Sequence, residues 1–124
     1  MKFRLIKSDK SARLGELHFN KGIIHTPVFM PVGTYGTVKT MTPDELTDIG
    51  AEIILANTYH LMIRPGKEIL SAHGGLHRMM SWQKPILTDS GGYQIWSLSK
   101  KRKINDEYVE FDSPVNGDLI RLTP

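Results

Sequence analysis

The 124-residue sequence contains no cysteine. This absence excludes a disulfide framework, a zinc site built on thiolates and a cysteine nucleophile within these residues. Long apolar runs are also missing, because no stretch approaches the roughly 18 consecutive apolar residues of a membrane helix. The N-terminus, MKFRLIKSDK, lacks the apolar core of a signal peptide, so we expect a cytoplasmic protein with no membrane partner.

The sequence has only a small excess of positive charge. Sixteen Lys and Arg against thirteen Asp and Glu give a formal net charge of +3. This excess permits a polyanionic partner without requiring one. With 40% hydrophobic and 23% charged residues, the composition is that of one globular unit, and the length fits one domain or part of a larger one.

Residues 1–27 predict an antiparallel sheet. The segments KFRLIK and ARLGELHF alternate loosely between apolar and polar residues, and the tripeptide NKG that follows supplies a turn. Pro27 and Pro31 then interrupt the run IIHTPVFMPVG, since proline cannot donate a hydrogen bond to a strand ladder. We expect one inner strand over residues 28–32.

Strands and helices are expected to alternate in the middle of the chain. Thr42, Pro43 and Glu45 have the spacing of a capping box with proline at the first helical position, and Gly50 can end that helix. The apolar runs AEIILAN and PILTD predict two buried strands, and the GG interruption in GKEILSAHGGLHRMM predicts two short helices between them. This order indicates parallel βαβ units over residues 28–96.

Residues 97–124 predict a β-hairpin insertion. EYVEF and DLIRL alternate as strands do, and the dipeptide NG between them is a strong hairpin signal. Three parallel strands at about Val28, Ile53 and Ile86 cannot close a barrel and would leave apolar edges exposed. We therefore expect an α/β chain that is the N-terminal portion of something larger.

Polar residues follow the two predicted buried strands where each one ends. Asn57 and Thr58 end one strand, and Asp89 and Ser90 end the next. Ligands of α/β folds bind at the carboxyl ends of strands, where we expect the amide and the carboxylate to hydrogen-bond. A partly desolvated carboxylate can exchange protons near neutral pH or accept N–H bonds from a purine-like heterocycle. Two glycines then permit close backbone approach, and Tyr93 can lie over a flat base.

Local structure offers an alternative interpretation of the same residues. Asp and Ser before glycine are favoured at helix N-caps and turns, and Asn57 with Thr58 can form a plain turn. No metal is expected, because glycines interrupt the helix that would bring His73 and His77 onto one face. The run KKRK at 100–103 indicates a solvated loop that can also contact phosphates.

Three segments closely resemble the N-terminal third of the tRNA-guanine transglycosylases, also called queuine tRNA-ribosyltransferases: TPVFMPVGTYGTVKTMTPDEL, GAEIILANTYHLMIRPG and ILTDSGGYQIWSLSKKRKI. The resemblance implies a (β/α)8 TIM barrel preceded by an antiparallel β-sheet, of which this chain holds an incomplete part. It implies exchange of guanine at the tRNA wobble position for a 7-deazaguanine, in queuosine biosynthesis, by a ping-pong reaction with a covalent intermediate. For the full-length form it implies a homodimer with residues 33–49 in the interface.

The resemblance also implies a role for each site residue. Asp89 corresponds to the aspartate that contacts the heterocycle and transfers protons, and it is not the family's nucleophile. Tyr93 corresponds to the aromatic residue that stacks on the base, and Ser90 belongs to the wall of the base pocket. Asn57 matches the amide near Asp89 and the ribose. The same pocket is lined by Val32, Thr58 and Gln94.

The family's nucleophilic aspartate and its cysteine-rich structural zinc site fall outside the matching segments. No cofactor is therefore expected within this chain, and we expect these residues alone to be inactive. Two interpretations stay open. One is a portion of an enzyme whose partners are tRNA, guanine and a 7-deazaguanine base, and the other is a non-catalytic truncated RNA-binding or structural remnant.

Overall fold

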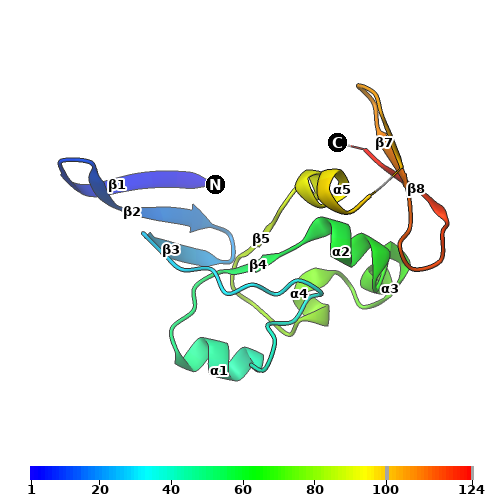
Figure 1. The fold of residues 1–124 in the computed structure, drawn as a ribbon. Coiled ribbons are helices and arrows are strands. Elements are labelled where there is room, and N and C mark those ends of the chain that lie inside the picture. Colours follow the sequence, from blue (N-terminus) through cyan, green and yellow to red (C-terminus); the bar gives the residue numbers. More distant parts are fainter. Residues whose placement is uncertain (100, 124) are drawn as a thin grey trace.

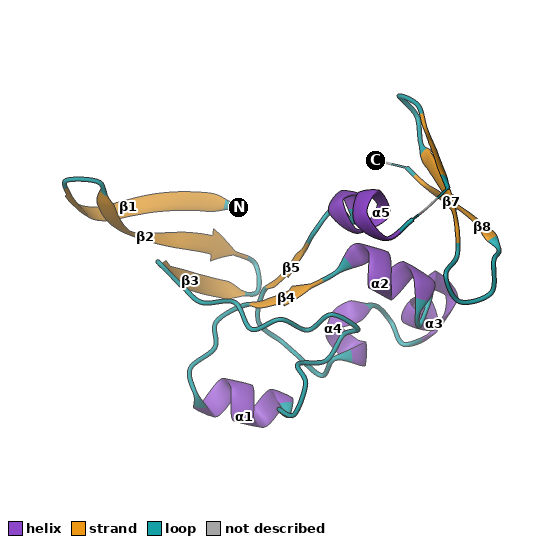
Figure 2. Ribbon diagram, in the orientation of Figure 1, coloured by secondary structure: helices purple, strands orange, loops and turns teal. Residues whose placement is uncertain are grey.

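The computed structural model describes residues 1–99 and 101–123 and has mixed α/β secondary structure (Figure 1, Figure 2). Lys100, the first residue of the basic run KKRK, lies outside the described residues. None of the helices in the described part of the chain has the length and apolar character needed to cross a membrane. In chain order the elements are β1 (Lys2–Asp9), β2 (Ala12–Phe19), β3 (Gly22–Thr26), α1 (Pro43–Asp48), β4 (Ile54–Ala56), α2 (Thr58–Ile63), α3 (Lys67–Ala72), α4 (Leu76–Met79), β5 (Ile86–Thr88), α5 (Gly92–Leu98), β6 (Arg102–Ile104), β7 (Val109–Asp112) and β8 (Leu119–Leu122).

The N-terminal sheet is antiparallel with the strand order β1-β2-β3, which confirms the prediction for residues 1–27. In its register, Leu17 of β2 lies between Phe3 of β1 and Ile24 of β3. Ile24 is fully buried, whereas every residue of β1 is exposed. Figure 1 shows why, because the sheet extends away from the helices with β1 at the edge far from β3.

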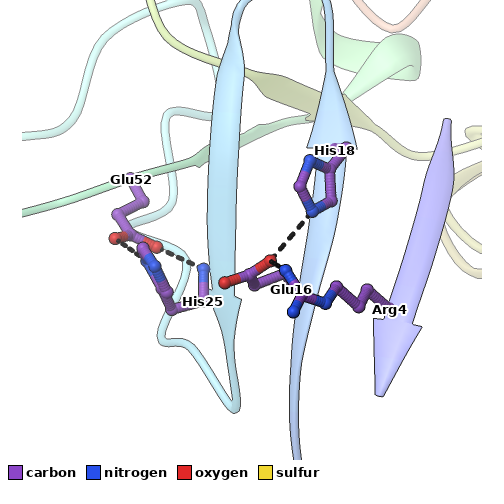
Figure 3. A network of polar contacts seen from close by, with 5 residues as sticks. All are labelled: Arg4, Glu16, His18, His25 and Glu52. Atoms are coloured by element: carbon purple, nitrogen blue, oxygen red, sulfur yellow. Dashed lines mark hydrogen bonds and ion pairs between the residues drawn. The ribbon is translucent and has the colours of Figure 1, made fainter. Parts of the chain in front are cut away.

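One ion pair joins this sheet to the segment that precedes β4. Glu52 accepts the backbone N–H of His25 at 2.6 Å, and its other carboxylate oxygen lies 2.7 Å from Nδ1 of the same histidine (Figure 3). On β2, Glu16 pairs with His18 at 2.9 Å and with Arg4 at 3.7 Å. The hydrogen bond to Glu52 and then its charge raise the pKa of His25. Burial acts to raise the pKa of Glu52, but its hydrogen bonds and ion pair with His25 outweigh burial and lower that pKa.

We expect this pair to make the free energy of unfolding fall as the pH rises above neutrality. The folded-state pKa of His25 is raised, so its contribution is complete below the unfolded value of 6.5 and is lost as the pH passes the folded value. The lowered pKa of Glu52 adds a contribution that is present above 4.5 and is lost as the pH falls. Urea denaturation between about pH 5 and 8 measures the first effect.

The variant for this measurement is Glu52→Gln, because glutamine can still accept the backbone N–H of His25 while removing the charge. We expect the loss of stability at high pH to shrink in this variant. Glu107→Gln is the control, since Glu107 is exposed on the loop before β7. Equal pH dependence in the wild type and in Glu52→Gln would contradict the role of the pair.

Helix α1 begins and ends where the sequence predicts. The Thr42 hydroxyl accepts the N–H of Glu45 at 3.2 Å, and the Glu45 carboxylate accepts the N–H of Thr42 at 2.7 Å. Gly50 has φ +79°, and its N–H and that of the next residue donate to carbonyls in the last helical turn, which is a Schellman motif. The apolar side of α1 joins the first core cluster: Leu46, Ala51, Ile54, Met80 and Trp82.

The parallel sheet is smaller than the sequence predicts. β4 and β5 pair in parallel, but residues 28–32 form no strand and contribute one isolated bridge, between Val32 and Leu55. The N–H of Leu55 donates to the carbonyl of Pro31 at 2.9 Å. Pro27 and Pro31 precede Val32 and have no N–H to donate, so the ladder cannot continue on the N-terminal side of this bridge. The prediction of an inner strand at 28–32 is wrong, although the segment does lie beside β4.

The break between α3 and α4 at Gly74 and Gly75 confirms the prediction of two short helices. Helices α2 and α5, in contrast, were not predicted. They have only six and seven residues, too few for the helical period to stand out. Packing stabilises them, because they meet β7 in the second core cluster: Tyr59, Ile95 and Phe111.

The C-terminal sheet has three antiparallel strands, β6-β7-β8, where the sequence predicts a two-stranded hairpin. The turn at NG is confirmed, with φ +78° at Gly117. The added strand β6 begins at Arg102 and Lys103, so the prediction of a solvated loop is wrong for these residues. Arg102 donates to the carbonyls of Trp96 and Ser99, at 3.1 and 3.0 Å. This cation therefore caps the carboxyl end of α5.

Candidate functional site

Two polar side chains meet at one edge of the parallel strand pair. Asn57 directly follows β4 and Asp89 directly follows β5, and the parallel pairing brings both strand ends to the same edge. The Nδ2–H of Asn57 donates to Oδ2 of Asp89 at 2.6 Å. The hydrogen bond expected between the amide and the carboxylate is therefore confirmed.

Further donors surround the Asp89 carboxylate. The backbone N–H of Thr58 donates to Oδ1 at 2.8 Å, and Nε2–H of Gln94 donates to Oδ2 at 3.1 Å. The hydroxyl of Thr58 also donates to the backbone carbonyl of Asp89. Asn57, Thr58, Asp89 and Gln94 thus form one hydrogen-bonded group, which we call the Asp89 cluster.

The N-cap interpretation of Asp89 is contradicted for the helix that follows it. Gly91 is the N-cap residue of α5, with φ +75° and no side-chain cap. Asp89 instead accepts the N–H of Thr58, the first residue of α2, from a different strand end. Local turn contacts are also present, since the Ser90 hydroxyl accepts the N–H of Gly92 at 3.3 Å and the backbone of Gly91 bonds to Asp89.

Asp89 is half-buried, and its electrostatic surroundings decide its protonation state. Burial raises the pKa of Asp89, but hydrogen bonds from Asn57, Thr58, Gln94 and the backbone of Gly91 outweigh burial and lower it below the usual value. At neutral pH the side chain is a carboxylate that acts as an acceptor. Proton exchange at Asp89 stays a prediction, and the lowered pKa favours the other predicted role, acceptance of N–H bonds from a heterocycle.

The remaining predicted site residues lie around the cluster and make no hydrogen bond to it among the described residues. Tyr93 is in the first turn of α5 and is 72% exposed. Its ring centroid lies 5.9 Å from that of Trp96. Val32 is 52% exposed and lies beside β4 through its bridge to Leu55. Tyr93 and Val32 are therefore both open to solvent.

Sequence reasoning from the residues missed the backbone donors of the cluster. The N–H of Thr58 reaches Asp89 only because α2 and α5 begin beside each other, whereas the backbone of Gly91, two residues after Asp89, acts on it locally. Gly91 allows this approach, since a Cβ there would lie 3.1 Å from the backbone nitrogen of Tyr59. Within the described residues, no three His, Asp or Glu side chains are grouped so that they could hold a metal ion.

Comparison with known proteins identifies relatives along the whole chain. The queuine tRNA-ribosyltransferase family matches residues 8–124. The chain is 62% identical over 124 residues to a queuine tRNA-ribosyltransferase of Thiobacillus denitrificans and 63% identical to one of Thioalkalivibrio sulfidiphilus. These matches cover 100% of this chain but 34% and 33% of the relatives, so the chain spans about a third of the length of the curated relatives it matches. The chain belongs to the queuine tRNA-ribosyltransferase family.

Proposed function

We propose that these residues are the N-terminal portion of a tRNA-guanine transglycosylase, and that the Asp89 cluster belongs to its base-binding site. Family membership supports the activity. The observation that carries the site is the ionised carboxylate of Asp89, held by donors that follow the end of β4 and by Gln94 of α5, the helix that also carries the exposed Tyr93. Carboxylate and aromatic ring together can hold a flat heterocycle by edge and face.

The proposed fold rests on the edge of the parallel sheet where β4 and β5 end. β4, β5 and the segment through Val32 would be the first strands of a (β/α)8 barrel, whose ligands bind at the carboxyl ends of the strands. Residues 1–27 would form the preceding sheet, 28–96 the first βα units and 97–124 an insertion. The Asp89 cluster lies at the edge of the sheet that such a barrel uses.

The chemistry proposed for Asp89 is recognition and proton transfer, not nucleophilic attack. Guanine presents N–H donors on its Watson–Crick edge, and a carboxylate accepts from them. A carboxylate has about four acceptor positions, and Asn57, Thr58 and Gln94 donate to three of them, while the backbone of Gly91 also acts on Asp89. A base that binds Asp89 through two N–H groups would therefore displace one donor. Gln94 is the candidate, because its 3.1 Å contact is longer than those from Asn57 and Thr58.

The other pocket residues take subsidiary roles in this proposal. Tyr93 stacks on the base, Ser90 contributes to the pocket wall, and Val32 and Thr58 line it. Asn57 orients the carboxylate, since its amide is already bonded to Asp89. The proposed partners are tRNA, guanine and a 7-deazaguanine, in the cytoplasm. A homodimer through residues 33–49 is supported by Ile49 at the end of α1, which is 65% exposed.

The structural zinc implied by the family does not fit these residues. The sequence has no cysteine, and the described residues contain no group of metal-binding side chains. No step of the proposed reaction passes through a metal in this part of the chain. The nucleophilic aspartate is likewise proposed to lie in the part of the relatives that this chain does not match.

The test is a chimera that joins residues 1–124 to the remaining two thirds of the Thiobacillus denitrificans relative. We measure incorporation of labelled guanine into unmodified tRNA by the chimera, by that relative and by residues 1–124 alone. The proposal expects exchange by the first two and none by the third. A folded chimera without exchange, beside an active relative, would contradict it and favour the remnant interpretation.

A further inference from the structure

Helix α5 carries a second exposed aromatic ring beside the proposed stacking residue. Gln94 of this helix donates to Asp89, and Ile95 is 3% exposed in the second core cluster. Tyr93 and Trp96 lie on the open side of the helix instead, 72% and 62% exposed. Residues three apart are neighbours on a helix surface, and the two ring centroids are 5.9 Å apart. The open side of α5 therefore presents two aromatic faces to solvent.

The two rings cannot enclose one base between them. Their planes are inclined by 43°, whereas a flat base that is stacked on both sides needs two nearly parallel rings. A base that stacks on Tyr93 therefore leaves the ring of Trp96 available to a second base. Single exposed apolar residues are ordinary on protein surfaces, so the groups around Trp96 must decide whether its ring has a ligand.

A guanidinium group lies at the end of α5 that follows Trp96. Nη1 of Arg102 donates to the backbone carbonyls of Trp96 and Ser99, at 3.1 and 3.0 Å, and these two bonds fix its position. A guanidinium has five N–H donors, and Nε and Nη2 of Arg102 make no hydrogen bond to the described part of the chain. Arg102 can therefore hold α5 and bind an anion at the same time.

The residues on either side of Arg102 are also basic. Lys101 and Lys103 are exposed, and neither they nor Arg102 forms an ion pair with a described carboxylate. Glu110 and Asp112 lie near them on β7, but Glu110 is paired with another cation, Arg121, at 2.6 Å. The basic run therefore keeps charge that is available to a polyanion.

We propose that an RNA strand runs along α5, with Trp96 stacked on the nucleotide next to the exchanged base and Arg102 bound to a phosphate of that nucleotide. The inference rests on the proposed function, in which Tyr93 stacks on the exchanged base itself. Unstacked RNA bases bind aromatic faces, and guanidinium groups bind phosphate. With seven residues α5 is about 10 Å long, so the contact covers only the immediate neighbour of the exchanged nucleotide.

The first experiment measures Kd of the chimera for an unmodified anticodon stem-loop RNA by fluorescence anisotropy. Trp96→Ala is expected to raise Kd about 5-fold to 150-fold, the worth of one stacked base, and Trp96→Phe to recover most of the loss because it keeps a ring. KM for guanine is expected to stay unchanged in both variants. Leu98→Ala is the control, since it removes a 55% exposed apolar side chain from another side of the same helix.

The phosphate contact is tested through the salt dependence of RNA binding. Arg102→Gln keeps an NH₂ donor for the carbonyls at the end of α5 and loses the charge. It is expected to weaken binding and to reduce the slope of log Kd against log salt by about 1. Lys7→Met, on the exposed strand β1, is the control and is expected to keep the slope of the wild type. An unchanged slope for Arg102→Gln would contradict the phosphate contact.

A double-mutant cycle separates contact with RNA from packing against the rest of the protein. An abasic residue on one side of the exchanged guanine is expected to weaken binding by the wild type and not by Trp96→Ala. Coupling on either side supports the proposal and fixes the direction of the strand. The proposal is overturned if neither side is coupled to Trp96, or if Trp96→Ala lowers the free energy of unfolding while RNA binding stays unchanged. Because binding is measured without turnover, a chimera that binds RNA but does not exchange guanine contradicts the proposed function alone.

Discussion

Asp89→Asn is expected to lower guanine exchange by the chimera at least about a hundredfold, because positioned proton transfer typically contributes that much or more. Asparagine keeps the shape of the side chain but loses its charge and its ability to take a proton. Its NH₂ group replaces one of the two acceptor oxygens of Asp89. In the place of Oδ2 it would leave Asn57 and Gln94 without an acceptor, and in the place of Oδ1 it would face the backbone N–H of Thr58.

Stability must be measured beside activity, since the cluster is also structural. An unpaired buried donor costs about 1 to 3 kcal/mol, and Asp89 is only half-buried, so we expect Asp89→Asn to fold with a loss near the lower end. The pKa of Asp89 is lowered, so its contribution to stability is present above 3.8 and is lost as the pH falls through the folded value. Urea denaturation at pH 7 and at low pH measures both effects.

Asp106→Asn is the matched control, because Asp106 is an exposed carboxylate in the loop between β6 and β7. It is expected to retain both the exchange rate and the stability of the wild type. A near-normal exchange rate for Asp89→Asn would contradict the catalytic role. Asp89 would then be a carboxylate that only stabilises the amino end of α2, where it accepts the N–H of Thr58.

The elements that the sequence predicts correctly are those with a local chemical cause. Thr42 and Glu45 complete a capping box within four residues of chain, and the pair of glycines at 74 and 75 needs no distant partner to end a helix. The antiparallel N-terminal sheet also has a local cause, since tight turns join its neighbouring strands. The strand expected at residues 28–32 failed because two prolines lack the donors of a ladder, although their effect was visible in the sequence.

The elements that the sequence does not predict depend on distant contacts. Helix α2 is held by Tyr59, which stacks on Phe111 of β7 at 5.5 Å between ring centroids. Nothing in the six residues of α2 specifies that partner. Strand β6 was likewise hidden, because its basic residues are typical of a solvated loop until β7 is present to pair with them. Tertiary packing often overrides weak local preference in short segments of this kind.

The candidate site likewise has one feature that the sequence predicts and one that depends on distant contacts. The bond between Asn57 and Asp89 could be predicted, because parallel strands bring their carboxyl ends together. The lowered pKa of Asp89 could be predicted only in part, since after Asn57 it depends on Thr58, Gln94 and Gly91, which lie at the start of two helices that the sequence did not reveal. A partly desolvated carboxylate was expected to exchange protons or to accept N–H bonds, and the donors around Asp89 favour the second role.

Tyr93→Ala is expected to raise KM of the chimera for the incoming base about 5-fold to 150-fold and to leave kcat nearly unchanged. The ring is 72% exposed at the start of α5, so it is available to a base rather than committed to the core. A stacking side chain is worth about 1 to 3 kcal/mol per base. Stacking stabilises the bound base and the transition state alike, and such uniform binding appears in KM.

Tyr93→Phe is the matched variant, because it keeps the ring and removes only the hydroxyl. Trp96 lies 5.9 Å away between ring centroids, and either aromatic ring at 93 preserves that contact, whereas alanine removes it. Steady-state kinetics of both variants therefore separate stacking from hydroxyl chemistry. If phenylalanine is as damaging as alanine, the hydroxyl carries the effect. If alanine lowers kcat with KM unchanged, Tyr93 acts on the chemical step or holds α5 in place, because loss of a stacking partner alone would weaken the bound base first.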